Sequence, residues 1–141
     1  ATAPAMSRHR VRAAMKPDVR FHVRGSKGGA ALAIGPGKVA LLEAIADKGS
    51  ISAAARTLNM SYRRAWLLVD ETNRCLARPA VAAAAGGSRG GGAVLTPDGV
   101  EFVRRYRELE RAARAGVDAR LSPLLRSVPA RTRVARDERG G

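Results

Sequence analysis

The sequence predicts a mainly helical α+β fold, and two observations support this prediction. Between residues 36 and 120, apolar residues recur at spacings of three and four, which places them on one face of a helix. Shorter apolar stretches, bounded by glycine and proline, have the length of β-strands. At 141 residues the chain is long enough for one domain with a modest core and tails.

Residues 49–74 are predicted to form two helices joined by a tight turn. Ser50 is the expected N-cap of the first helix. The residues of its predicted buried face are Ile51, Ala54, Ala55 and Leu58. Asn59 stands where the chain must reverse, because Asn adopts a left-handed conformation at little cost. Ser61 is then the expected N-cap of a longer helix over 61–76.

The second helix is predicted to be apolar on its inward side and basic at its start. Its inward stripe consists of Ala65, Leu68, Val69 and Leu76. Arg63 and Arg64 lie off this stripe. A short first helix, a tight turn and a polar start to the second helix are the features of a helix-turn-helix. We therefore predict that residues 61–76 form a recognition helix that lies in the DNA major groove.

The residues before this motif are predicted to form an arm, a pair of strands and a third helix. Residues 1–18 are basic and lack a convincing period, so we expect a flexible arm. Apolar and basic residues alternate over 19–24, which predicts a half-buried strand that pairs with 31–34. A helix is predicted over 36–48, with Gly49 as its C-cap residue. Its expected buried residues are Val39, Leu42, Ile45 and Ala46, with Leu41 on their flank.

A hairpin is predicted directly after the recognition helix. Residues 80–85 and 93–95 are expected to pair weakly across a glycine-rich tip at 86–92. A hairpin in this place is a wing, and Arg89 at its tip would reach the minor groove or a phosphate. The alternative is a plain flexible connection.

A long helix is predicted over 97–120, because Thr96 and Pro97 form a strong helix start. Residues spaced close to an a/d seam along it are Phe102, Tyr106, Leu109, Ala113 and Val117. They predict a dimerisation helix, and the alternative is that they pack wholly on their own domain. We thus expect a winged helix-turn-helix domain over 19–121 and a disordered Arg-rich tail over 122–141.

The charge of the chain favours nucleic acid as a partner. Lys and Arg number 26 against 12 Asp and Glu, which gives a net charge of +14. No run approaches the roughly 18 apolar residues of a membrane-spanning helix. The single cysteine, Cys75, excludes an internal disulfide and a multi-cysteine metal site, and it suits a reducing cytoplasm. We expect a nucleoid-associated, cytoplasmic protein with no catalytic residues, no cofactor and no metal.

Residues 32–109 resemble the N-terminal DNA-binding domain of the ModE family of molybdate-responsive regulators, and more closely its short relatives that consist of that domain alone. The resemblance is carried by GSISAAA, by SYRRAW with Asn73 beyond it, by GG-x-x-GGGAVLT and by LTPDG. The helix-turn-helix alone is also similar to that of LysR-type regulators, which share GS-x-x-AAA and LT-x-x-G. The resemblance implies a winged helix-turn-helix homodimer that binds a palindromic operator.

The chain departs from the family in two respects. Full-length members carry a separate molybdate-binding module, and the 141 residues leave too few to build one, so molybdate binding is not expected. Any small-molecule effector is unknown. Residues 82–85 are alanines where the family has larger strand residues and an acid.

The predicted DNA contacts lie on both helices of the motif and on the wing. They are Ser50, Ser52, Ser61, Tyr62, Arg63, Arg64, Leu67, Ser88, Arg89 and Gly90. One of Arg63 and Arg64 would bond a guanine edge while the other holds a phosphate, and their assignment stays open. The alternative is that both are solvated helix charges. Tyr62 would touch a thymine methyl group or a phosphate.

Four further residues have predicted places outside this set. Lys38 and Lys48 are expected on helix surfaces, within reach of backbone phosphates. Trp66 is expected in the core, because a large aromatic side chain anchors a small domain well. Cys75 is expected to be a small buried apolar residue.

Together these features predict a sequence-specific transcriptional regulator that binds double-stranded DNA as a homodimer. Two alternatives remain open. One is an architectural, nucleoid-type protein that binds DNA through charge without base selectivity. The other is a winged-helix module that binds a protein partner through its long helix.

Overall fold

The structure is a computed structural model, and it describes residues 12–15, 17–25, 29–84, 91–125 and 127–129. The chain divides into two compact units. The larger comprises Val19–Ala113, and the smaller combines Ala1–Asp18 with Arg114–Gly141. Within the described residues, no helix is long and apolar enough to cross a membrane.

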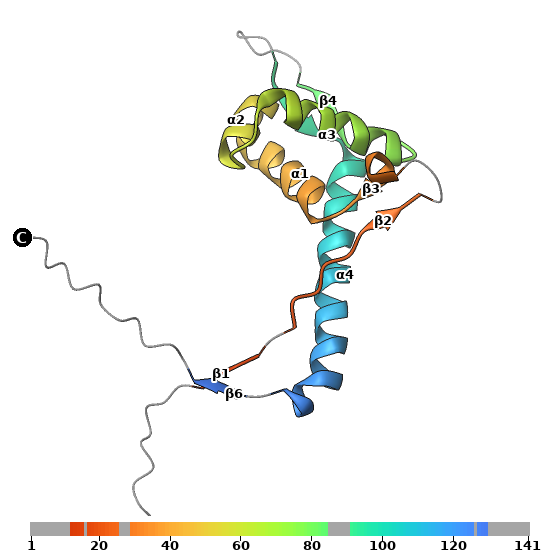
Figure 1. Cartoon of the computed structure of the whole chain (residues 1–141). Coiled ribbons are helices and arrows are strands. Elements are labelled where there is room, and N and C mark those ends of the chain that lie inside the picture. The colour runs from red at the N-terminus through yellow and green to blue at the C-terminus, as the bar shows by residue number, and fades with distance from the viewer. Residues whose placement is uncertain (1–11, 16, 26–28, 85–90, 126, 130–141) are drawn as a thin grey trace, which may run out of the picture. The chain divides into compact units, whose positions relative to one another are not determined.

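The larger unit is mainly helical, as the sequence predicts (Figure 1). The helices α1 (Pro36–Lys48), α2 (Ile51–Thr57) and α3 (Tyr62–Cys75) follow one another with short connections. The long helix α4 (Pro97–Leu121) begins in this unit, and the division between the units falls within it. All four helices lie within two residues of their predicted bounds.

The predicted helix ends are confirmed residue by residue. Gly49 ends α1 in a left-handed conformation, with φ of 75°. Asn59 has φ of 54° at the turn between α2 and α3. Ser50 and Ser61 each accept a hydrogen bond on the side-chain oxygen from the amide three residues later. Thr96 does the same at the start of α4, at 3.1 Å.

The first pair of strands is shorter than predicted. Strand β2 (Val23–Arg24) pairs antiparallel with β3 (Ala33–Ile34), and a 3-10 helix, η1 (Gly29–Leu32), precedes β3. The pairing stops short of residues 19–22 because Phe21 is held by α4 instead. Its carbonyl accepts a hydrogen bond of 2.7 Å from the Tyr106 hydroxyl.

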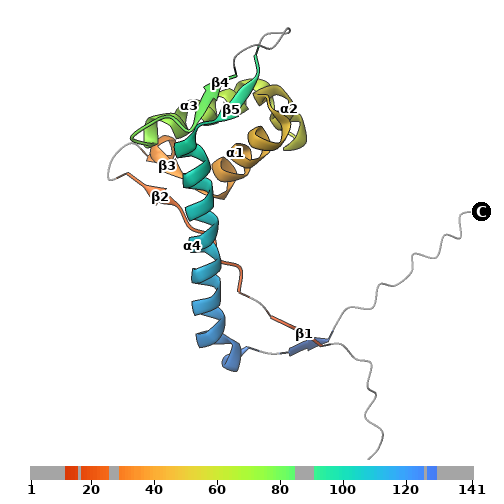
Figure 2. The ribbon, with the colours of Figure 1, turned by 180° about the vertical axis from the view of Figure 1, so that it is seen from behind.

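The second pair of strands is confirmed. Strand β4 (Val81–Ala83) pairs antiparallel with β5 (Ala93–Leu95), so that Val81 lies opposite Leu95 (Figure 2). The predicted tip, including Ser88, Arg89 and Gly90, lies largely outside the described residues.

The main core lies between α1, α2, α3 and the hairpin. Its buried residues are Leu41, Leu42, Ala44, Ile45, Ala54, Ala55, Ala65, Val69, Ala80, Val81 and Ala93. The burial predicted within α1 is wrong at two positions, since Leu41 is 1% exposed and Ala46 is exposed. The reason is that α1 contacts α2, α3, β3 and β5 together, so its buried surface is wider than one stripe.

A second, smaller core forms around Tyr106 of α4. Its side chain is 2% exposed and stacks on Phe21, with ring centroids 4.2 Å apart. Burial raises the pKa of Tyr106. Because the ring is enclosed by its own chain, the prediction that Tyr106 takes part in dimerisation is wrong. Phe102 also packs on both cores, whereas Leu109 is 58% exposed.

The smaller unit contains two short strands that the sequence did not predict. Strand β1 (Arg12–Ala14) pairs antiparallel with β6 (Ser127–Pro129), and a 3-10 helix, η2 (Ser122–Leu124), follows α4. These strands fall within the predicted arm and tail. Most of the remaining arm and tail lies outside the described residues.

We predict that Gly99→Ala destabilises the protein by about 1–3 kcal/mol, as overpacking does. A Cβ atom at Gly99 would lie 2.2 Å from the carbonyl oxygen of Ala80, a backbone atom that cannot move aside alone. Gly116→Ala, on the same helix, is the control. Among the described residues, no atom lies within 4 Å of a Cβ atom added at Gly116. Gly116→Ala should therefore stabilise the helix by up to about 1 kcal/mol. Urea unfolding followed by circular dichroism measures both, and equal stability of the two variants would contradict this packing.

Candidate nucleic-acid interface

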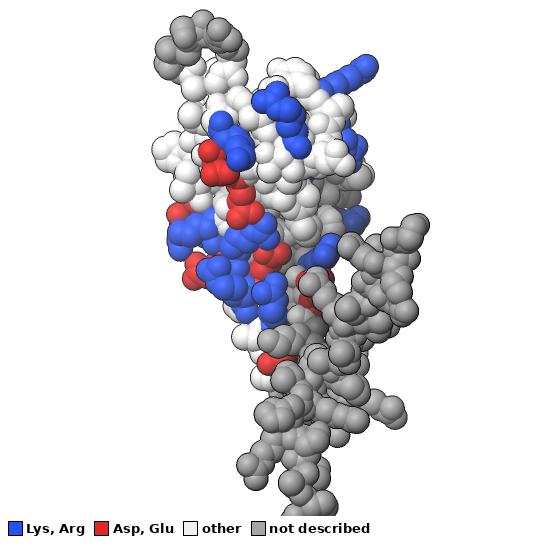
Figure 3. All heavy atoms as spheres, turned by 90° about the vertical axis from the view of Figure 1, so that its left-hand side faces the viewer, with Lys and Arg blue, Asp and Glu red and all other residues white. Residues whose placement is uncertain are grey.

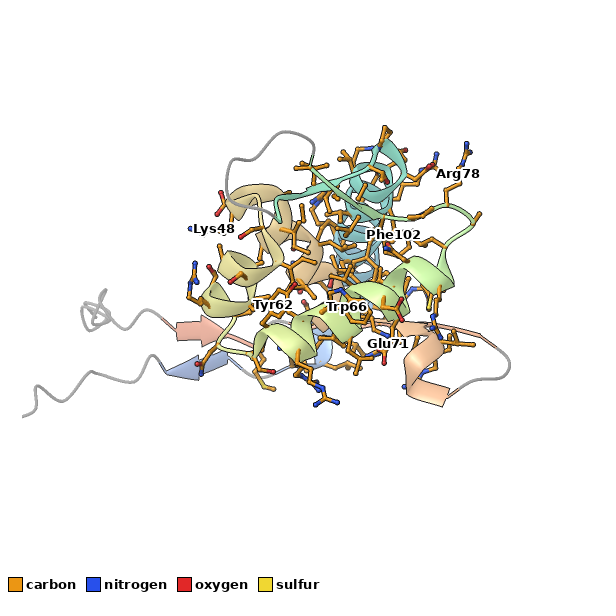
Figure 4. The ribbon with its side chains drawn as sticks, turned by 90° about the horizontal axis from the view of Figure 1, so that it is seen from above. Lys48, Tyr62, Trp66, Glu71, Arg78 and Phe102 are labelled. Carbon is orange, nitrogen blue, oxygen red and sulfur yellow. The ribbon has the colours of Figure 1, made fainter. Side chains whose placement is uncertain are left out.

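The start of α3 presents large side chains to solvent. Tyr62, Trp66 and Leu67 are 58%, 53% and 48% exposed, and Arg63 and Arg64 are exposed as well. Tyr62 and Trp66 both extend from the first half of the helix (Figure 4). Large exposed apolar side chains beside an exposed arginine, such as Tyr62 and Trp66 beside Arg63, are typical of an interaction site.

The prediction that Trp66 packs in the core is wrong. The buried residues of α3 are Ala65, Val69 and Thr72, at the spacing of one helical face. Residue 66 lies about 100° around the helix from residue 65, so its side chain leaves the core. Thr72 was missed as a core residue, and its hydroxyl is satisfied by donating to the Leu68 carbonyl at 2.7 Å.

Arg63 and Arg64 form no ion pair with an acidic side chain of the described residues. Among the described residues, no carboxylate oxygen lies within 4.0 Å of either guanidinium group. Arg74, near the other end of α3, instead pairs with Asp70 at 3.2 Å. The first half of α3 is therefore the part of this helix with free positive charge.

The arginines in the first half of α4 are engaged in ion pairs. Arg104 and Arg105 contact Glu101 at 2.6 and 2.7 Å, and they lower the pKa of Glu101 to about 2. Arg107 is bound by Glu43 of α1 and by Glu110. On the face drawn in Figure 3, acidic and basic side chains accordingly lie next to one another. These arginines have less charge to offer a polyanion than Arg63 and Arg64.

The two neighbouring arginines of α3 face different surroundings. Arg63 lines a shallow hollow of about 250 Å³ together with Tyr62 and Trp66. Arg64 lines a separate cavity of about 400 Å³, whose wall also contains Arg24 of β2.

The prediction that Lys38 lies on an ordinary helix surface is wrong. Its side chain is 7% exposed and lies in the wall of the larger cavity. The ammonium group contacts Glu71 of α3 at 3.0 Å and donates to the Ala33 carbonyl at 2.7 Å. These contacts offset the cost of burying its charge. Lys48, by contrast, lies on the surface beside Asp47.

Of the predicted serine contacts, Ser88 lies outside the described residues, and the other three are exposed or half-buried with oxygen atoms that already accept local hydrogen bonds. Ser50 and Ser61 are the N-cap residues of α2 and α3. Ser52 accepts from Arg56 at 3.5 Å. Each hydroxyl keeps its hydrogen to donate to a phosphate oxygen.

Asn73 is a positioning residue that sequence reasoning noted only as part of a motif. Its side-chain oxygen accepts from the amides of Ala80 and Val81, at 2.8 and 3.1 Å. Its side-chain nitrogen donates to the Val81 carbonyl at 3.3 Å. At the other strand, the Ala93 amide donates to the Gly49 carbonyl at 2.9 Å. The hairpin is thereby held against α3 and against the end of α1.

We predict that Asn73→Ala destabilises the protein by about 1–3 kcal/mol, because it leaves buried backbone amides without a partner. The amide hydrogens of Ala80 and Val81 should then exchange faster with solvent, which NMR hydrogen exchange measures. Arg74→Ala is the matched control, since Arg74 is exposed and should change stability by less than about 1 kcal/mol. Unchanged exchange at Ala80 and Val81 in Asn73→Ala would show that Asn73 does not hold the hairpin.

Comparison with known proteins identifies several bacterial relatives. The chain is 48% identical over 95 residues to the molybdenum-pterin-binding protein MopB of Rhodobacter capsulatus. This aligned stretch is 67% of this chain and 34% of MopB. It is 42% identical over 91 residues to the molybdenum transport protein ModE of Azotobacter vinelandii, 64% of this chain and 33% of that protein. It is 41% identical over 71 residues to the DNA-binding transcriptional dual regulator ModE of Escherichia coli strain K12, 50% of this chain and 27% of the regulator.

The chain thus spans about a third or less of the length of these relatives. No family model matches it. Identities above 40% over at least half of this chain are nevertheless consistent among the three relatives. We conclude that the chain is related to the ModE and Mop proteins of bacteria.

Proposed function

We propose that this chain is a sequence-specific transcriptional regulator that binds double-stranded DNA. The observation that carries the proposal is the exposed start of α3, where Arg63 and Arg64 have no acidic partner among the described residues. The relationship to a protein named as a DNA-binding transcriptional regulator supports it independently.

In this proposal α2 and α3 form the helix-turn-helix, and the β4–β5 hairpin is its wing. The order of the elements and the left-handed Asn59 between the helices match that motif. Helix α3 would lie in the major groove, with its first residues at the base edges. The wing tip at 86–92 would contact the adjacent groove.

The exposed side chains of α3 suit a DNA groove. An arginine can bond a guanine edge bidentately, which contributes about 1–3 kcal/mol of discrimination. Tyr62, Trp66 and Leu67 offer apolar surface to the C5-methyl group of thymine. Because Trp66 is exposed on α3, we add it to the candidate DNA contacts.

We further propose that the regulator acts as a homodimer on a palindromic operator. The half-sites would then be about one helical turn, roughly 34 Å, apart. Leu109 is exposed on α4, and Ala113 and Val117 are half-buried, so these three remain available for a helix–helix contact. The molybdenum in the names of the relatives is not part of the proposal, because those names do not say which part of each protein is involved.

We predict that Arg63→Ala/Arg64→Ala lowers the preference for a selected operator over random DNA by about 1–3 kcal/mol or more. Duplexes enriched from a random pool supply the operator, and titration at two salt concentrations measures both affinities. Arg74→Ala, which removes one arginine from the other end of the same helix, is the control. Its arginine is already paired with Asp70, so it should bind both duplexes like the wild type.

Other outcomes favour the alternatives. If no motif is enriched and affinity only falls with salt, phosphate contacts dominate and an architectural role replaces the regulator. If the double variant binds every duplex like the wild type, α3 does not bind DNA. A protein-binding role for the same surface would then be the better explanation.

A further inference from the structure

We infer that the cavity lined by Arg24 and Arg64 binds one phosphodiester group of the DNA backbone, whereas Arg63 reads the bases. This inference rests on the proposed function and deepens it. It assigns separate roles to two adjacent arginines that the sequence could not distinguish.

The cavity has a cationic wall and small residues that leave it open. Its volume is about 400 Å³, and Arg24, Arg64 and His22 lie around it. Gly35 and Gly37, at the start of α1, line it without side chains. A Cβ atom at Gly35 would lie 2.2 Å from the His22 ring, so the absence of a side chain there lets the ring lie against the backbone.

The acidic residue in the wall is already neutralised. Glu71 lies along α3 (Figure 4) and pairs with the buried Lys38 at 3.0 Å. Among the described residues, no carboxylate oxygen lies within 4.0 Å of Arg24 or Arg64. Two uncompensated guanidinium groups therefore border one hollow. An anion with several oxygen atoms, such as a phosphate, is the ligand that guanidinium geometry fits best.

The direction of each arginine on α3 distinguishes their roles. Successive residues on a helix differ by about 100°, so neighbouring side chains diverge. Arg63 shares its hollow with the aromatic side chains Tyr62 and Trp66. Arg64 instead shares the larger cavity with Arg24 of β2 and Ala33 of β3. A helix in the major groove meets bases along its inner ridge and phosphates along its flanks, which assigns Arg64 and Arg24 to the backbone.

The first measurement compares single variants on specific and random duplexes over a range of salt. We expect Arg24→Ala and Arg64→Ala to weaken binding to both duplexes by the same factor. The double variant Arg24→Ala/Arg64→Ala should reduce the magnitude of the negative slope of log K against log salt by about 0.9, which is the loss of one phosphate contact. Each single variant should reduce it by part of that amount. Arg63→Ala should instead lower the preference for the operator. Arg24→Lys keeps the charge and should keep the slope, and Arg74→Ala should behave like the wild type.

The second measurement replaces operator phosphates, one at a time, with neutral methylphosphonate groups. We expect one position in each half-site where the replacement weakens binding by the wild type and by Arg63→Ala. At that position, Arg24→Ala should not weaken binding further, because the phosphate charge that Arg24 contacts has already been removed. A parallel melting experiment with inorganic phosphate alone tests whether a free anion uses the cavity instead.

Three results would overturn the phosphate site. In the first, Arg24→Ala binds like the wild type at every salt concentration. In the second, no methylphosphonate position changes the effect of Arg24→Ala. In the third, inorganic phosphate raises the melting temperature while no methylphosphonate position weakens binding. None of them affects the proposed regulator if Arg63→Ala still loses its preference. If no operator is enriched for the wild type, the proposed function itself fails.

Discussion

The arrangement of the hairpin and the helices depends on the close packing around Ala80. This residue is fully buried at the start of the second strand pair, and both of its backbone groups are bound. Its amide donates to Asn73 of α3, and its carbonyl accepts from Thr96, the residue that caps α4. Gly99 brings α4 so close that no side chain would fit. Three elements thus meet at one residue, and a shift of any of them moves the hairpin relative to α3.

The distribution of ion pairs, rather than the net charge, distinguishes the candidate interface. The arginines in the first half of α4 form ion pairs with glutamates on the same helix or on α1. Those at the start of α3 have no such partners among the described residues. A charge that is already paired attracts a polyanion less, because the opposite charge of its acidic partner cancels part of its field. A net charge of +14 therefore does not by itself locate the proposed DNA-binding surface.

Buried polar groups give the larger unit its precise geometry. Lys38 and Glu71 join α1 to α3, and the Tyr106 hydroxyl joins α4 to the segment before β2. Each group has a partner, and in the described residues no buried side-chain nitrogen or oxygen lacks one. Because an unpaired buried polar group is costly, such contacts favour one relative position of the elements they join. They also shape the cavity beside α3, since Lys38 holds the acidic group that would otherwise repel an anion.

The helices, their caps and the hairpin could be predicted from the sequence, because these elements depend on local preferences. Ser50, Ser61 and Asn59 act within one turn of the chain, and the apolar spacing of each helix is visible along it. The burial of several large side chains could not be predicted, because it depends on the packing of distant elements. Trp66 was expected in the core and is exposed, whereas Lys38 was expected on the surface and is buried. Burial depends on how the surrounding elements pack on a helix, and more residues of α1 than of α3 are buried. Helix geometry makes Arg63 and Arg64 point in different directions, but their different surroundings come from residues distant in the sequence: Arg24 and Ala33 lie beside Arg64 and not beside Arg63.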